Sequence, residues 1–385
     1  MMIDTLPQVE CSGDANEMGR QQGEALRGNI VAAIDAVGEL EAFRLMKPKW
    51  MPMAWFRRLA ERKAQQFMQA AFQAGPQDFG QRFIGICEGA NLPQTKLALC
   101  CLLEAVMSDL TRSSQQRPNG LQAGCSAIAV TGVASKDGEA RVMHNFDHVP
   151  LVQQFFVVRR TSPTGKLRSV EFTLSPLLGA VDGVNEAGLG VTCNYAYVTD
   201  AMTTGPTITM LISRVLAEAR NVHEAIQIIK GQPRVGGGLL MLADASGEIA
   251  SIEVSNTRVE VRMPSDGVVF HTNRLQCGSM VPLEIAADAC YDKRAPSLLR
   301  GKRVHDSANM RADAIGRAVK GRGPMSLDDM REILSDHGQG QSCNSVCMHG
   351  GYWSTVACTQ LLPRQQRLRV AFSNTCQAKL QEFEV

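Results

Sequence analysis

The sequence changes character at Cys125, and that change restricts the folds open to the chain. From Cys125 onward, short β-branched or aromatic runs alternate with Gly, Asp and Pro; examples are CSAIAVTGVA, RVMHNFD, QQFFVVRR, LRSVEFTL and GLGVTCNYAY. In ASKDGEA and ADASGEIA a glycine-containing turn separates two such runs, which is typical of β-hairpins. Strands joined in this way favour antiparallel sheets.

The residues before Cys125 predict helices instead. Apolar side chains recur at helical spacing in NEMGRQQGEALRGNIVAAIDAVGEL, AWFRRLAERKAQQFMQAAF and PQTKLALCCLLEAVMSDL, although glycines such as Gly19 and Gly23 weaken the first helix. Helices return between later strands, where Asn221 and Ser326 look like N-caps. We therefore predict an α+β protein with a helical N-terminal segment, residues 1–124, and a layered catalytic domain, residues 125–385.

Composition argues against several kinds of partner. The 385 residues include 40 Lys and Arg against 38 Asp and Glu, so the net charge of +2 favours neither nucleic acid nor an anionic membrane. No apolar run approaches the length of a membrane-spanning helix. The twelve cysteines are too sparse for a disulfide scaffold, and many lie in apolar stretches. Buried thiols and an N-terminus without a signal-peptide pattern predict a cytoplasmic protein.

The sequence lacks the common cofactor and metal motifs. It has no GxGxxG after a strand, no GxxxxGK[ST] and no GxSxG. HNFDH spaces two histidines four apart but lacks the helical HExxH context of a zinc protease. CNSVCMH offers Cys343, Cys347 and His349, yet no second Cys/His pair beside it completes a tetrahedral site. We therefore expect no metal and no resident cofactor.

Small polar residues gather instead at the ends of predicted strands. They are Cys125 at the start of one, His144, Asn145 and Asp147 at the end of a second, Asn194 at the end of a third and Asn273 at the end of a fourth. Asn and Asp often only cap turns at such places. Because each residue borders an apolar run, we predict that these side chains converge at one edge of a sheet.

Cys125 allows two interpretations. It is either a small core residue or a residue that becomes an N-terminus when the chain is cut after Gly124. In the second case one residue carries a thiol nucleophile and an α-amine, whose reference pKa of about 7.7–8.0 suits a general base. Gly124 favours the cut, because glycine adopts backbone angles that expose its carbonyl to the thiol.

Three further residues complete this hypothesis. Asp147 would hold and orient the amine. Asn194 would donate an N–H to the oxyanion of a tetrahedral intermediate, a contribution of roughly 3 kcal/mol. Asn273 would bind the amine or the substrate amide.

At these residues the sequence resembles a known family. MGRQQGEALRGNI, GCSAIAV, MHNFDH, GVNEAGLGVTCNY, HTN and SCNSVCMH occur in the order and spacing of the acyl-coenzyme A:6-aminopenicillanic acid acyltransferase family, which are cysteine N-terminal nucleophile hydrolases. Bile salt hydrolases and penicillin V acylases are similar but more distant. The resemblance implies a four-layer αββα sandwich and supports the same roles for Cys125, Asp147, Asn194 and Asn273.

The resemblance also sets expectations about substrate and partners. It implies an enzyme that forms an acyl thioester on Cys125 from a small amide or thioester, with coenzyme A as a candidate co-substrate, and two fragments that stay associated after the cut. A homo-oligomer is left open. The candidate pocket residues are Tyr195, His349 and the strand-end residues His144 and Asn145. The alternative is a catalytically silent member that binds a metabolite or a partner protein.

Two positions depart from the family pattern. Met348 stands where the family usually has Arg, and His144 stands where bile salt hydrolases have Arg. An arginine supplies a fixed positive charge near the nucleophile. We expect His144 or His349 to supply that charge here.

Overall fold

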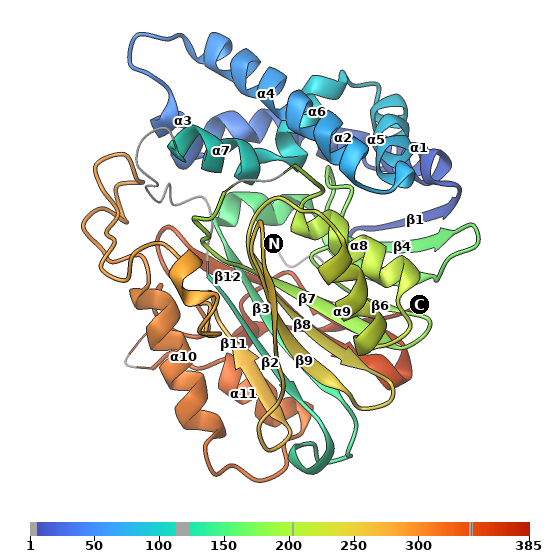
Figure 1. The fold of residues 1–385 in the computed structure, drawn as a ribbon, viewed down its shortest axis with the longest axis vertical. Coiled ribbons are helices and arrows are strands. Elements are labelled where there is room, and N and C mark those ends of the chain that lie inside the picture. The colour runs from blue at the N-terminus through green and yellow to red at the C-terminus, as the bar shows by residue number, and fades with distance from the viewer. Residues whose placement is uncertain (1–5, 113–123, 202–203, 339, 341) are drawn as a thin grey trace.

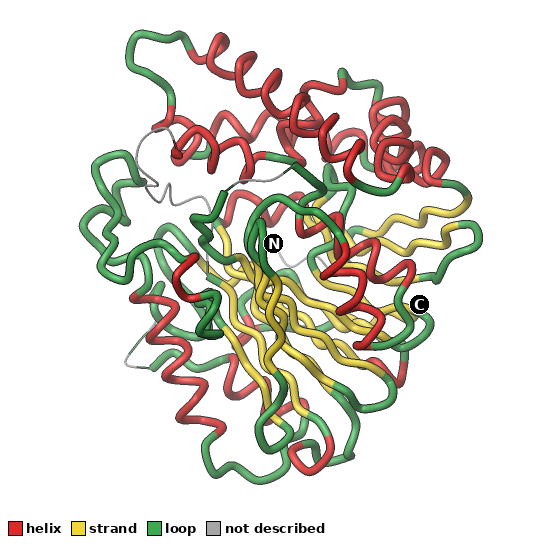
Figure 2. The backbone as a smooth tube through the Cα atoms, viewed as in Figure 1, coloured by secondary structure: helices red, strands yellow, loops and turns green. Residues whose placement is uncertain are grey.

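Two β-sheets lie face to face between layers of helices (Figures 1 and 2). The computed structural model describes residues 6–112, 124–201, 204–338, 340 and 342–385. A further group of helices from the N-terminal segment, drawn in blue to teal in Figure 1, covers one end of the sandwich. None of the helices in these ranges has both the length and the hydropathy to cross a membrane.

The first sheet has the strand order β1-β4-β5-β6-β7-β8-β9-β10. Its strands are β1 (Gln8–Gly13), β4 (Phe156–Pro163), β5 (Ser169–Leu174), β6 (Asp182–Asn185), β7 (Leu189–Tyr195), β8 (Gly238–Asp244), β9 (Ile249–Val254) and β10 (Val259–Arg262). Neighbouring strands are antiparallel, as predicted, except for β1 and β4, which run parallel.

The second sheet has the order β11-β2-β3-β12-β13-β14 and is antiparallel throughout. Its strands are β2 (Cys125–Val130), β3 (Arg141–His148), β11 (Val268–His271), β12 (Ser354–Leu362), β13 (Arg367–Ala371) and β14 (Gln381–Glu384). Cys125 lies opposite Phe146, and Ala127 lies opposite His144. Because side chains alternate along a strand, Cys125 and His144 project from the same face of this sheet.

Separate apolar clusters hold the four layers together. Residues such as Ala127, Val142 and Phe172 pack between the sheets. The helices α8 (Ile208–Glu218) and α9 (Val222–Gly231) cover the outer face of the first sheet, and α10 (Asp306–Val319) and α11 (Leu327–Leu334) cover that of the second. The α+β class and the four-layer αββα sandwich are therefore confirmed.

The N-terminal helices pack through glycines. They are α1 (Ala15–Ala25), α2 (Arg27–Ala36), α3 (Glu41–Met46), α4 (Met53–Ala74), α5 (Gln77–Ala90), α6 (Gln94–Cys101) and α7 (Leu103–Arg112). A Cβ added at Gly19 of α1 would lie 2.2 Å from the carbonyl oxygen of Arg82, and one at Gly85 of α5 would lie 2.1 Å from that of Asn16. The glycines that weaken the first helix thus let α1 and α5 approach closely.

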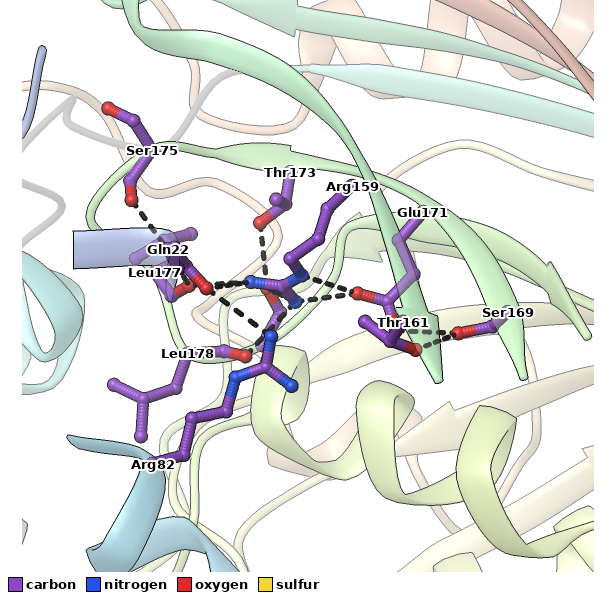
Figure 3. A network of polar contacts seen from close by, with 11 residues as sticks. Gln22, Arg82, Arg159, Thr161, Ser169, Glu171, Thr173, Ser175, Leu177 and Leu178 are labelled. Atoms are coloured by element: carbon purple, nitrogen blue, oxygen red, sulfur yellow. Dashed lines mark hydrogen bonds and ion pairs between the residues drawn. The ribbon is translucent and has the colours of Figure 1, made fainter. Parts of the chain in front are cut away.

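The N-terminal segment is not wholly helical, and in this the prediction was wrong. Strand β1 joins the first sheet beside β4, and a buried polar network strengthens the junction (Figure 3). Gln22 of α1 donates to the carbonyl oxygen of Ser175 at 3.0 Å and accepts from Arg159 of β4, also at 3.0 Å. Arg159 in turn forms a 2.6 Å ion pair with Glu171 of β5. Burial and the nearby Arg159 lower the pKa of Arg82, which also donates to Gln22, to about 10.

Candidate active site at Cys125

Cys125 is the first residue of β2 and is 3% exposed. It lines a cavity of about 230 Å³ at the end of the sandwich. Ile128 and Val130 belong to the cluster under α10 and α11, whereas Ala127 packs between the sheets. By the alternation of β2, the thiol of Cys125 therefore faces the first sheet.

The backbone nitrogen of Cys125 is held by Asn273. Its N–H donates to Asn273 Oδ1 at 2.8 Å, and Asn273 Nδ2 donates to the carbonyl oxygen of Tyr195 at 2.8 Å. Asn273 thus connects the backbone nitrogen of Cys125 to the end of β7. This nitrogen is the atom that a cut after Gly124 would turn into an α-amine.

Arg311 of α10 completes this arrangement, and sequence analysis missed it. The side chain is 1% exposed. It donates to the carbonyl oxygen of Cys125 at 2.5 Å, to Ser126 Oγ at 2.9 Å and to Asn273 Oδ1 at 2.7 Å. One signal was present, because Arg311 shares the buried face of its helix with Ala308 and Ile315 at helical spacing. An arginine on an otherwise apolar helix face is expected to pair with something buried.

Packing restricts which residue can stand at position 124. A Cβ at this position would lie 2.3 Å from Met348 Cε and 2.7 Å from Arg311 Nη2. The ends of the Met348 and Arg311 side chains thus limit the space at Gly124, and a side chain at this position would require one of them to move.

Asp147 lies beside the same bond. Its N–H donates to the carbonyl oxygen of Gly124 at 3.1 Å, and its Oδ1 accepts from Thr355 Oγ1 at 2.6 Å. Its Oδ2 is buried and accepts no hydrogen bond from the residues that the structure describes. Burial raises the pKa of Asp147 to about 7, although Arg311, Thr355 and His144 oppose the rise. This carboxylate has one oxygen available for a cation.

Asn194 connects the two sheets at the site. It is fully buried near the end of β7, and its Nδ2 donates to the carbonyl oxygen of Thr272 at 2.9 Å. Thr272 immediately precedes Asn273. An amide nitrogen carries two hydrogens, so one hydrogen of Asn194 Nδ2 is not used by this bond.

His144 is a buried cation beside the thiol. Its Nδ1 lies 2.8 Å from Asp182 Oδ2 of β6. Burial alone would lower the pKa of His144, but the Asp182 carboxylate, with a smaller contribution from the Cys125 thiol, outweighs burial and raises this pKa to about 10. An imidazolium favours negative charge on a neighbouring sulfur.

Three of the four predicted pocket residues do not line the cavity. His144 is fully buried and is not among the lining residues. Asn145 projects from the opposite face of β3, where Nδ2 donates to the carbonyl oxygens of Leu334 and Val346 and Oδ1 accepts from Thr375. These bonds are structural, so its assignment to the pocket was wrong. His349 is not among the residues that line the cavity and instead contacts His337, Cys347 and Cys376. Tyr195 does line the cavity, as predicted.

The cavity wall is mostly apolar, with Asp147 at the Cys125 end. Its other lining residues include Leu102, Phe146, Val152, Leu174, Val181, Ile208 and Val235. Glu104 of α7 also lines it, and burial raises the pKa of Glu104 to about 7. Many protein atoms surround Glu104, which raises this pKa, although the residue keeps accessible surface. Sequence analysis missed this residue too.

A sequence model of the acyl-coenzyme A:6-aminopenicillanic acid acyl-transferase family matches residues 133–375, more than half of the chain. The chain belongs to this family. No curated protein sequence shows significant similarity to it. The predicted family is thus confirmed.

Three solved structures are among those with some likeness to the chain. Conjugated bile acid hydrolase from Clostridium perfringens is 14% identical, with 68% of this chain and 97% of that one covered and a TM-score of 0.44. The N-acylethanolamine-hydrolyzing acid amidase ortholog of Caenorhabditis elegans is 13% identical, with 68% of this chain and 100% of that one covered and a TM-score of 0.43. Penicillin V acylase from Agrobacterium tumefaciens is 14% identical, with 68% of this chain and 86% of that one covered and a TM-score of 0.42.

Proposed function

We propose that this family member is a self-cleaving cysteine amidohydrolase or acyltransferase, with Cys125 as nucleophile and its α-amine as general base. One observation carries the proposal. Both reactive groups of Cys125 have a polar partner. The buried imidazolium of His144 lies beside the thiol, and Asn273 accepts a hydrogen bond from the backbone nitrogen. A cysteine that served only as core packing would need neither.

The first step is the cut itself. Cys125 Sγ attacks the carbonyl carbon of Gly124, the C–N bond breaks, and the acyl group moves to sulfur while the nitrogen takes up a proton as an amine. Water then hydrolyses the thioester, releasing the Gly124 carboxylate and the free thiol. The N–H of Asp147 donates to the attacked carbonyl at 3.1 Å and would stabilise the charge that develops on its oxygen.

The freed amine then serves substrate turnover. Its reference pKa of about 7.7–8.0 allows it to take the thiol proton near neutral pH. Asn273 Oδ1 would keep its hold on the amine, and Asp147 Oδ2 would accept from the ammonium that forms. The remaining hydrogen of Asn194 would bind the oxyanion of the tetrahedral intermediate. Water, or an amine acceptor, resolves the acyl thioester.

The size and the apolar lining of the cavity favour a substrate with a small apolar acyl group. Its walls offer aliphatic and aromatic side chains, and its volume of about 230 Å³ is below the roughly 300–1,000 Å³ common for drug-sized ligands. Glu104 would face the bound group. With a pKa raised to about 7, it can donate a hydrogen bond in its neutral form. Coenzyme A as a carrier of the acyl group stays a prediction.

The two fragments would stay together after the cut. Strand β1 pairs with β4 along its length, and Gln22 is bonded to Ser175, Leu177 and Arg159 on the far side of the cleavage point. These contacts do not depend on the bond between Gly124 and Cys125.

The mass of the purified protein under denaturing conditions tests the proposal. The uncut chain has a mass of 41.8 kDa. A cut before Cys125 gives pieces of about 13.5 and 28 kDa, in proportion to 124 and 261 of the 385 residues. Two pieces in the wild type and one in Cys125→Ala support self-cleavage. One uncut chain in both refutes it and favours the silent, ligand-binding alternative.

A further inference from the structure

A second cluster of reactive side chains lies outside the cavity. It consists of His337, Cys347, His349 and Cys376. The first three belong to the connection between α11 and β12, and Cys376 lies in a short 3₁₀ turn, η6 (Thr375–Gln377), that follows β13. One ligand atom from each of the four residues lies within 4.8 Å of the others.

The three distances from His349 fit a tetrahedral zinc site, and the other ligand atoms lie within 4.8 Å of one another. Nε2 of His349 lies 3.1 Å from His337 Nε2, 3.5 Å from Cys347 Sγ and 3.4 Å from Cys376 Sγ. Zn–N bonds of about 2.0–2.1 Å and Zn–S bonds of about 2.3 Å, at tetrahedral angles, place two nitrogens about 3.3 Å apart and a nitrogen and a sulfur about 3.5 Å apart. The observed distances agree with these values to within about 0.2 Å.

Hydrogen bonding alone does not account for the cluster. Nε2 of a neutral imidazole either donates one hydrogen or accepts with one lone pair. His349 Nε2 nevertheless has three partners within 3.5 Å. A metal ion at the centre would satisfy all four ligands at once, because each would direct a lone pair to it.

We propose that His337, Cys347, His349 and Cys376 bind one structural zinc ion. Two thiolates and two imidazoles at tetrahedral spacing are the ligand set that zinc prefers. Binding would release the two thiol protons to solvent, so that two thiolates neutralise the charge of Zn²⁺. All four positions are filled by protein, which leaves none for a catalytic water. Sequence analysis could not assemble this set, because His337 and Cys376 lie outside CNSVCMH.

The proposed zinc would support the cleavage site. Its ligands Cys347 and His349 flank Met348, whose side chain packs against Gly124. The N–H of Met348 donates to Thr355 Oγ1 at 2.8 Å, and the same hydroxyl donates to Asp147 Oδ1. Met348 also accepts from Thr355 N–H at 3.0 Å. Fixing Met348 would therefore fix both the packing of Gly124 and the orientation of Asp147.

Elemental analysis of the full chain, produced without a histidine tag in zinc-supplemented medium, tests the proposal. We expect about one zinc per chain in the wild type, and a fall to below about a tenth of that in Cys376→Ser and in His349→Ala. Cys343→Ser is the matched control, since this cysteine lies in the same loop but outside the cluster, and it should keep its zinc. Absence of zinc from the wild type, or equal zinc in the ligand variants, would overturn the proposal.

A second measurement, made on the wild type, tests the site even if the variants fail to fold. Wild-type protein exchanged into Co²⁺ should show the visible bands of tetrahedral cobalt and a thiolate-to-cobalt charge-transfer band. A cobalt spectrum without these bands contradicts the site. So does an intact mass that shows Cys347 and Cys376 joined as a disulfide in protein isolated without oxidant.

Discussion

Replacing Asp147 by asparagine should stabilise the fold at alkaline pH while it removes the partner of the amine. Burial raises the pKa of Asp147 to about 7 in the native state, against about 3.9 in an unfolded chain. The native state therefore binds the proton more tightly. This contribution to stability is fully present below about pH 4 and is lost as the pH rises to about 7.

The size of the effect follows from that difference. Between the two pKa values the native state holds nearly one proton more than the unfolded state, so the free energy of unfolding falls by about 1.4 kcal/mol per pH unit. From pH 5 to pH 8 the loss amounts to roughly 2.5 kcal/mol. The amide of the Asp147→Asn variant cannot ionise, so the variant escapes this loss.

The comparison is best made in a chain that cannot cut itself. Cys125→Ala and Cys125→Ala/Asp147→Asn are unfolded with urea at pH 5 and at pH 8. The interactions that shift the pKa of Asp147 come from burial, Arg311, Thr355 and His144, so the alanine leaves them in place. We expect the double variant to gain about 2.5 kcal/mol relative to the single variant between the two pH values. A stability difference that stays constant with pH would refute the reasoning, because the carboxyl would then titrate normally.

Three further predictions concern the thiol, the oxyanion and the cleavage bond. Asp182→Asn removes the carboxylate that raises the pKa of His144, so alkylation of Cys125 by iodoacetamide at pH 7 should slow; an unchanged rate would exclude the imidazolium from thiol activation. Asn194→Ala should lower kcat on p-nitrophenyl hexanoate by about 10²–10³, with Asn145→Ser, which alters a structural amide, as a comparison for general destabilisation; equal losses in both would contradict an oxyanion role. Gly124→Ala should prevent the cut, because its Cβ would clash with Met348 Cε, and Gly124→Ala/Met348→Ala should recover part of it by intact mass; no recovery would point to Arg311 as the limiting contact.

Much of the sandwich was predictable because strand signals are local. CSAIAV, RVMHNFD, STVACTQLL and RLRVAFS are strands β2, β3, β12 and β13 in the structure. The N-cap of α11 is a capping box between Ser326 and Asp329, visible from the spacing of the two residues. Strand β1 was missed because its QVECSG precedes a helical stretch.

The site was less predictable, because its contacts join distant segments. Cys125, Asn194 and Asn273 could be chosen as strand-end residues, but the hydrogen bond between Cys125 and Asn273 spans 148 positions. Asn145 has the same local pattern as Asp147, two residues away. Strand alternation alone does not say which residue has free polar atoms. Only the packing of α11 and Thr375 against Asn145 shows that its amide is fully used.

The strands that contribute the site residues also predict at which stage of folding the chain would cut itself. The nitrogen of Cys125 is held by Asn273 after β11, the thiol faces His144 of β3, and the carbonyl of Gly124 accepts from Asp147 of the same strand. The charge on His144 in turn depends on Asp182 of the other sheet. The charge on His144 therefore requires that both sheets have formed and packed together. The proposed cut would therefore follow folding, at a stage when β1 and Gln22 already hold the N-terminal segment in place.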